Sequence, residues 1–154
     1  MNSDGGGEDF ILEKVAPRLV GWHLDKWLAE EPQHKWAFVQ QPELAVQIHA
    51  HLLQRLKPLL SRNPRSFVSK YLHFHNRELF PIYDSRATAA IRLVTPASRH
   101  VETIPAACAD EAYSSFCARL HWLLRHLQSQ FGVRLSLREV DNLLLEVHRR
   151  ANRT

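Results

Sequence analysis

Apolar side chains recur every three or four residues along most of this 154-residue chain, and this spacing constrains the fold more than any other feature. Residues three or four positions apart lie on the same face of an α-helix, so the pattern marks helices with one buried face. The pattern is clearest after residue 110, and the sequence therefore predicts an all-α fold. The apolar face of the longest predicted helix comprises Tyr113, Phe116, Cys117, Leu120, Leu123, Leu124 and Leu127.

The C-terminal segment carries the signals of a further helix. The long helix is predicted to stop at residues 130–132, which have the sequence Gln-Phe-Gly. Ser136 followed three positions later by Glu139 is a capping-box pattern, in which each side chain binds the other residue's backbone N–H. Apolar residues then continue at helical spacing to Val147, which predicts a final amphipathic helix.

Other segments have the same helical spacing. We expect one or two helices over residues 9–30, with Asp9 as a candidate N-cap and a break at Pro17. Further helices are predicted over residues 43–60 and 67–75 and from Asp84 or Ser85 to Arg92. The connections between these helices are residues 32–42, 79–83 and 95–105.

The length and the composition indicate one domain. A chain of 154 residues with 45% hydrophobic residues supplies a single core, because cores commonly grow to about 100–200 residues before a chain divides. We expect one all-α domain over residues 9–154. Residues 1–8 are polar and contain three successive glycines, so we expect a disordered leader there.

Composition also excludes several classes of protein. Two cysteines, Cys108 and Cys117, fit neither a disulfide framework nor a zinc cage, which favours a reduced, cytoplasmic protein. No segment approaches the roughly 20 apolar residues of a membrane span. Only Gly21 and Gly132 lie outside the run at 5–7, so glycine-rich phosphate loops are excluded and no cofactor is expected. The formal net charge of +4 permits nucleic-acid binding without requiring it.

Ten histidines raise the question of a metal site. His49 and His51, like His73 and His75, are two positions apart. Ligands that share one face of a helix need a spacing of three or four residues, so each pair points in different directions. We therefore predict no metal site.

Side chains able to carry chemistry are densest in residues 66–86. Asp84 follows an apolar segment that contains a proline, and it precedes a predicted helix. An acid in this position is held rigidly, and burial beside apolar walls would raise its pKa. Asp84 is therefore the leading candidate for a positioned, chemically active carboxylate.

Residues 60–92 resemble the helix-hairpin-helix DNA glycosylase superfamily. Residues 80–85, with the sequence Phe-Pro-Ile-Tyr-Asp-Ser, look like the family's Pro-Val-Asp-Thr segment, in which the aspartate is catalytic. Residues 60–66 correspond to its hairpin, and Asp84 follows Ser66 by 18 residues, a spacing similar to that between the family's lysine and aspartate. The resemblance implies a helix-hairpin-helix glycosylase-like fold, duplex DNA as the partner and Asp84 as the catalytic residue.

Ser66 stands where bifunctional members of the family have the nucleophilic lysine, so the resemblance implies base excision without lyase activity. Such a monofunctional glycosylase needs the aspartate and an activated water. A base flipped out of the duplex needs aromatic or apolar walls. The candidate pocket residues are Tyr71, His73, Phe74, His75, Phe80 and Tyr83, and the candidate DNA contacts are Arg62, Arg65, Ser66, Lys70 and Arg86.

Two alternatives remain open. Arg62 and Pro64 replace the hairpin glycines, and Pro64 has no N–H to offer a phosphate. In the first alternative the chain is a non-catalytic helical subunit of a larger bacterial system that binds a protein partner or a second copy of itself. In the second it is a nucleic-acid-binding module without chemistry. In both alternatives Asp84 is only a helix N-cap. Three tryptophans are expected in the core or at an interface rather than in a platform for bases: Trp22, Trp27 and Trp36.

Overall fold

The computed structural model describes residues 11–153, and these residues form helices and no strand. The predicted all-α fold is therefore confirmed for this part of the chain. The candidate N-cap Asp9 and the expected leader 1–8 lie outside the described residues. The α-helices are α2 (Ala16–Gly21), α3 (Leu24–Ala29), α4 (Ala37–Gln40), α5 (Pro42–Leu56), α6 (Arg65–His75), α7 (Ser85–Val94), α8 (Glu111–Phe131) and α9 (Leu137–Ala151), joined by the π-helical turn η1 (Ile11–Val15) and the 3₁₀ turns η2 (Lys57–Leu59) and η3 (Ser98–His100).

The helix ends follow from local sequence. Asp84 caps α7, where its side chain accepts a hydrogen bond from the Ala87 amide at 2.9 Å. The predicted capping box is present at α9, with Ser136 and Glu139 each binding the other's backbone N–H. Gly132 ends α8 with a φ of 67°, a left-handed conformation that glycine adopts without the steric cost of a Cβ.

Three details differ from the sequence prediction. Residues 32–42 contain the short helix α4, and α5 already begins at Pro42, because the first turn of a helix does not need the N–H that proline lacks. For the same reason Pro17 lies inside the first turn of α2. The larger break in this region falls at His23, whose φ of 51° separates α2 from α3.

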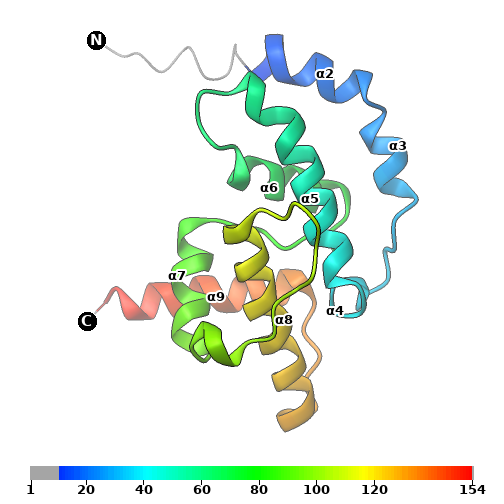
Figure 1. Ribbon diagram of the computed structural model, residues 1–154. Coiled ribbons are helices and arrows are strands. Elements are labelled where there is room, and N and C mark those ends of the chain that lie inside the picture. Colours follow the sequence, from blue (N-terminus) through cyan, green and yellow to red (C-terminus); the bar gives the residue numbers. More distant parts are fainter. Residues whose placement is uncertain (1–10, 154) are drawn as a thin grey trace.

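The helices pack mainly on α5 and α8 (Figure 1). Helix α5 contacts α4, α6 and α8, while α7 lies between α8 and α9. Helix α9 runs across α7, and these two helices form the most extensive helix pair of the described residues. This packing brings the start of α7, which carries Asp84, close to α6 and α9.

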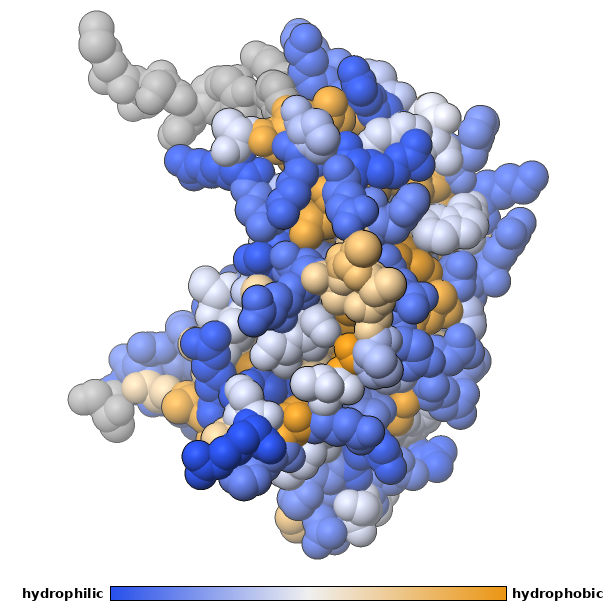
Figure 2. Space-filling model, viewed as in Figure 1, coloured by the Kyte–Doolittle hydropathy of each residue, from blue (hydrophilic) through white to orange (hydrophobic). Residues whose placement is uncertain are grey.

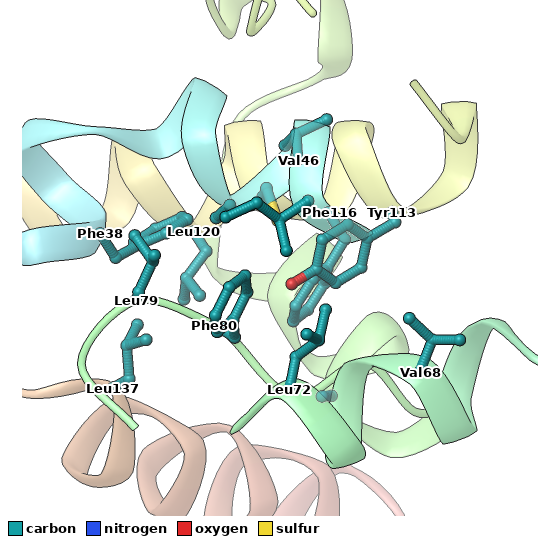
Figure 3. Close-up of a cluster of buried hydrophobic side chains, with 14 of the residues drawn as sticks. Phe38, Val46, Val68, Leu72, Leu79, Phe80, Tyr113, Phe116, Leu120 and Leu137 are labelled. Carbon is teal, nitrogen blue, oxygen red and sulfur yellow. The ribbon is translucent and has the colours of Figure 1, made fainter. Parts of the chain in front are cut away.

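One hydrophobic core joins these helices. It extends along the chain from Val15 to Leu144 and includes aromatic rings from the first, middle and last thirds of the described residues. Figure 3 shows Phe80 among Leu72, Phe116 and other apolar side chains of the cluster. Phe80 is fully buried, so the loop between α6 and α7 is fixed by the core at its centre.

The tryptophans predicted to lie in the core or at an interface occupy separate places at its edge. Trp22 is half-buried beneath the Arg55 guanidinium, 4.2 Å from the ring centroid, and Trp36 is half-buried near Arg134. Trp27 is more exposed and meets the His51 ring edge-on. The three rings therefore do not stack on one another.

Polar side chains cover most of the face shown in Figure 2, and its left outline is indented above α7 and α9. Among the described residues, every helix is too short or too polar to cross a membrane.

Candidate functional site

The backbone that leads into Asp84 is tied to α6 by the buried hydroxyl of Ser69. This hydroxyl accepts a hydrogen bond from the Tyr83 amide at 2.9 Å and donates one to the Ser66 carbonyl at 2.9 Å. The Asp84 carbonyl then accepts the first bond of α7, from the Thr88 amide. Asp84 is therefore held on both sides, and its half-buried carboxylate has little freedom to move.

A second carboxylate lies in the electrostatic field of Asp84. Asp141, on α9, is half-buried, and burial followed by the nearby Asp84 charge raises the pKa of its carboxyl group. His73, Arg138 and Arg86 act in the opposite direction without cancelling the increase. We call these five residues the Asp84 cluster. It combines two acids, one imidazole and two exposed arginines from α6, α7 and α9.

The imidazole of this cluster has a defined orientation. Nδ1 of the buried His73 lies 2.7 Å from the Phe80 carbonyl oxygen, and a carbonyl only accepts hydrogen bonds. The proton of the neutral ring is therefore on Nδ1, which leaves the Nε2 lone pair as an acceptor.

A polar cavity of about 500 Å³ opens on the α8 side of α7. Tyr83, directly before Asp84, lines it, as do side chains from the first turns of α6, α7 and α8. We call it the basic cavity, because four of its lining residues are basic: Lys57, Arg65, Arg92 and Arg119.

Arg65 is already paired inside this cavity. Its guanidinium forms two hydrogen bonds with the Asp110 carboxylate, at 2.5 and 2.9 Å, and lies 5.5 Å from the centre of the Tyr83 ring. Burial would raise the pKa of Asp110, but the bonds from Arg65 and from the Tyr113 amide outweigh it and lower that pKa. Asp110 also caps α8, so the pair joins the starts of α6 and α8.

Behind the pair lies a buried histidine. The His49 ring stacks on Tyr113 with a centroid distance of 3.6 Å, and its Nε2 donates to the Arg65 carbonyl at 3.3 Å. Nδ1 is buried and has no hydrogen-bond partner among residues 11–153. Burial is the main cause that lowers the pKa of His49 to about 4, so the ring is neutral at neutral pH.

The six side chains predicted to wall a base pocket do not surround one cavity. Tyr71 and His75 turn toward α3, where both contact Asp25, and burial together with that contact raises the pKa of Tyr71 to about 12. Phe74 is 76% exposed, whereas Phe80 is fully buried in the core. Successive positions on α6 point in different directions, and this disperses the group. His73 belongs to the Asp84 cluster and Tyr83 to the basic cavity.

The predicted DNA contacts are also divided. Arg62 and Lys70 are exposed, and Ser66 is half-buried in the first turn of α6. Arg65 lines the basic cavity but is paired with Asp110, and Arg86 belongs to the Asp84 cluster. Within residues 11–153 no group of three or more His, Cys, Asp or Glu side chains is arranged to hold a metal ion.

Sequence reasoning missed Asp141 and Asp110. Asp141 lies beside Val140 and between Leu137 and Leu144 on the buried face of α9, and an acid within an apolar stripe is a signal that the spacing could have given. Asp110 was visible as an N-cap three residues before Tyr113, but its pairing with Arg65 joins residues 45 positions apart.

Comparisons of this chain with protein-family models, with curated proteins and with solved structures give no match. The residues and their geometry therefore carry the functional argument.

Proposed function

We propose that this protein acts on duplex DNA as a monofunctional base-excision glycosylase of the helix-hairpin-helix kind, with Asp84 as its catalytic carboxylate. The observation that carries the proposal is the position of the half-buried Asp141 within the electrostatic field of Asp84, because burial and then the Asp84 charge raise the pKa of Asp141. Hydrolysis of glycosidic bonds commonly uses two carboxyl groups in different protonation states, one ionised and one protonated.

Each acid has a separate role in this reaction. The Asp84 carboxylate orients a water molecule and stabilises the positive charge that develops on the sugar as the bond to the base breaks. Asp141 in its protonated form donates a proton to the departing base. The water then adds to the sugar carbon and loses its own proton to a carboxylate, which leaves an abasic site and a free base.

The order of the elements also supports the proposal. Helix α5 and the turn η2 lead through residues 60–64 into α6, and a loop then leads to the capped start of α7. This is the order that the resemblance over residues 60–92 implies. Ser66 gives no amine for a Schiff base, so the proposed reaction does not cut the strand.

Strand scission after hot alkali tests the activity, with labelled duplexes that carry uracil, alkylated, oxidised or hypoxanthine bases. We expect the wild type to release one of these bases and Asp84→Asn to be at least about 100-fold slower. Asparagine caps helices as well as aspartate, so this variant keeps its N-cap and isolates the charge. Activity of Asp84→Asn equal to the wild type, or no cleavage of any duplex by folded wild type, would overturn the proposal.

Asp141→Asn tests the second acid. Loss of the proton donor should slow base release and remove the decline of activity at high pH that titration of Asp141 gives the wild type. An Asp141→Asn enzyme with the rate and pH profile of the wild type would show that Asp84 works without it.

A second function is favoured by one observation. Phe131 is 69% exposed and Val133 41%, on either side of Gly132 at the turn between α8 and α9. Adjacent exposed apolar side chains are typical of a site that binds another protein. A non-catalytic interaction protein would form a stable oligomer in light scattering that Phe131→Ser dissociates, and it would show no base release.

A further inference from the structure

A second cavity adjoins the basic cavity. It has a volume of about 550 Å³, and its walls include the apolar side chains Val101, Ile104 and Ala118. We call it the apolar cavity. The two cavities share three lining residues on α8, Glu111, Ser115 and Arg119, so they adjoin along this helix.

One face of α8 forms the floor of both cavities. Residues 111, 115 and 119 follow one another at intervals of four, so they lie in one row along the helix. Ser114 and Ala118 extend this row into the apolar cavity, whereas Ala112 and Phe116 extend it into the basic cavity.

Arg119 has a fixed position where the two cavities adjoin. Its guanidinium donates hydrogen bonds of 2.8 Å to the Thr95 hydroxyl, the Pro96 carbonyl and the Ser98 hydroxyl. These bonds hold the segment after α7 against α8. Arginine has five N–H groups, so two remain for a ligand.

The basic cavity has positive charge that the described residues do not neutralise. Asp110 compensates Arg65, but Lys57 and Arg92 are exposed and form no ion pair within residues 11–153. Together with Arg119 they exceed the one remaining acid, Glu111, by two charges. A phosphate monoester, with about two negative charges at neutral pH, matches this excess.

We propose that the two adjoining cavities together bind a phosphorylated nucleotide, with the phosphate between Lys57 and Arg92 and the flat, largely apolar base in the apolar cavity. A ligand with an anionic part and an apolar part fits the two halves, whereas a simple anion would use only one. The nucleotide is either free or the phosphorylated end of a DNA strand, because both present the same group. Neither Asp84 nor Asp141 lines these cavities, so this site is independent of the proposed base excision.

Isothermal titration calorimetry with deoxyadenosine 5′-monophosphate, deoxyadenosine, inorganic phosphate and single-stranded dodecamers with or without a 5′-phosphate tests this site. We expect the monophosphate to bind at least about tenfold more tightly than deoxyadenosine or phosphate alone, because only it fills both halves. Tighter binding of the phosphorylated dodecamer than of the monophosphate would identify a strand end as the ligand, and equal or weaker binding would identify the free nucleotide.

Two variants separate the halves. Lys57→Gln/Arg92→Gln should weaken the monophosphate at least about tenfold, while Lys26→Gln/Arg77→Gln, which removes the same charge at residues lining neither cavity, should not. Ser114→Leu narrows only the apolar cavity, so it should weaken the monophosphate and leave inorganic phosphate unchanged.

Three results would overturn the site. The first is that neither the monophosphate nor the phosphorylated dodecamer binds at about 1 mM. The second is equal affinity for the monophosphate and inorganic phosphate. The third is an equal loss of monophosphate affinity in Lys57→Gln/Arg92→Gln and in Lys26→Gln/Arg77→Gln. Asp84→Asn should bind the monophosphate like the wild type, so failure of this site and failure of base excision are distinguishable.

Discussion

At the scale of single residues, two aspartates each have two structural roles. Asp84 caps α7 and also acts electrostatically on Asp141, and Asp110 caps α8 and also pairs with Arg65. The capping task follows from local sequence alone. The second task depends on residues brought close by folding, so it can be separated from the first by substitutions that keep the cap.

The cap at Asp84 gives a direct test of this separation. Asp84→Ala should lower the free energy of unfolding by about 1 kcal/mol, because the Ala87 amide loses its acceptor. Asp84→Asn should change it by less than half as much. Urea denaturation followed by circular dichroism measures both, and equal losses would show that the charge rather than the cap stabilises the fold.

His49 should make the fold sensitive to acid. Its pKa of about 4 in the folded protein lies below the ordinary value of 6.5, so the unfolded chain binds more protons between these two pH values. The stability from the neutral ring is complete above pH 6.5 and is lost as the pH falls toward 4, by up to about 3 kcal/mol.

His49→Phe keeps a ring for stacking on Tyr113 and removes the titration. The free energy of unfolding, measured by urea denaturation from pH 7 to pH 4, should decline less steeply in this variant than in the wild type. The lowered pKa of Asp110 makes ionisation of this carboxyl group stabilise the fold, and this stabilisation is lost only at lower pH. Asp110 is present in both the wild type and His49→Phe. Parallel profiles would contradict the assignment to His49.

At the scale of elements, most helices and several of their ends could be predicted, because spacing and caps are local properties. The capping box of α9, the cap at Asp84 and the end of α8 at residues 130–132 are confirmed. Helix α4 was missed because four residues give no recognisable period. The dispersal of Tyr71, Phe74 and Phe80 was missed because the direction of each side chain depends on which neighbour covers α6 and its loop.

The two described glycines, both at helix ends, allow the cost of a positive φ to be measured by comparison. Gly132 has a φ of 67°, so Gly132→Ala should cost about 1 kcal/mol from backbone strain alone, since among residues 11–153 no atom beyond its chain neighbours lies within 4 Å of an added Cβ. Gly21, in α2, has the same open surroundings without the positive φ, so Gly21→Ala should be neutral or stabilising by less than about 1 kcal/mol. Urea midpoints compare them, and equal losses would refute the strain argument.

At the scale of the whole molecule, one core sets the places of residues far apart in sequence. The electrostatic effect of Asp84 on Asp141 requires α9 to pack across α7, and the two adjoining cavities require the segment after α7 to fold back on α8. Local spacing carries no information on these long-range pairings. For this reason Asp84 could be selected from the sequence, but its acidic neighbour and the cavities beside it could not.

Substitutions of two phenylalanines measure how much burial in the core contributes to the free energy of unfolding. Phe80→Ala, at a fully buried ring, should lower the free energy of unfolding by about 3–5 kcal/mol, whereas Phe74→Ala, at a ring that is 76% exposed, should change it by less than about 0.5 kcal/mol. Both are read from urea denaturation at neutral pH. A loss at Phe74 as large as that at Phe80 would mean that a partner surface covers Phe74.

The positions of the tryptophans at the core edge give the protein an uneven optical signal. Three of the four lie between residues 22 and 36, and Arg55 on α5 covers the first of them. Intrinsic fluorescence therefore reports mainly on how this N-terminal part is attached to α5, while ellipticity reports on all helices. If α2 and α3 detach before the rest unfolds, the fluorescence transition will precede the loss of ellipticity, and coincident transitions will mark one cooperative unit.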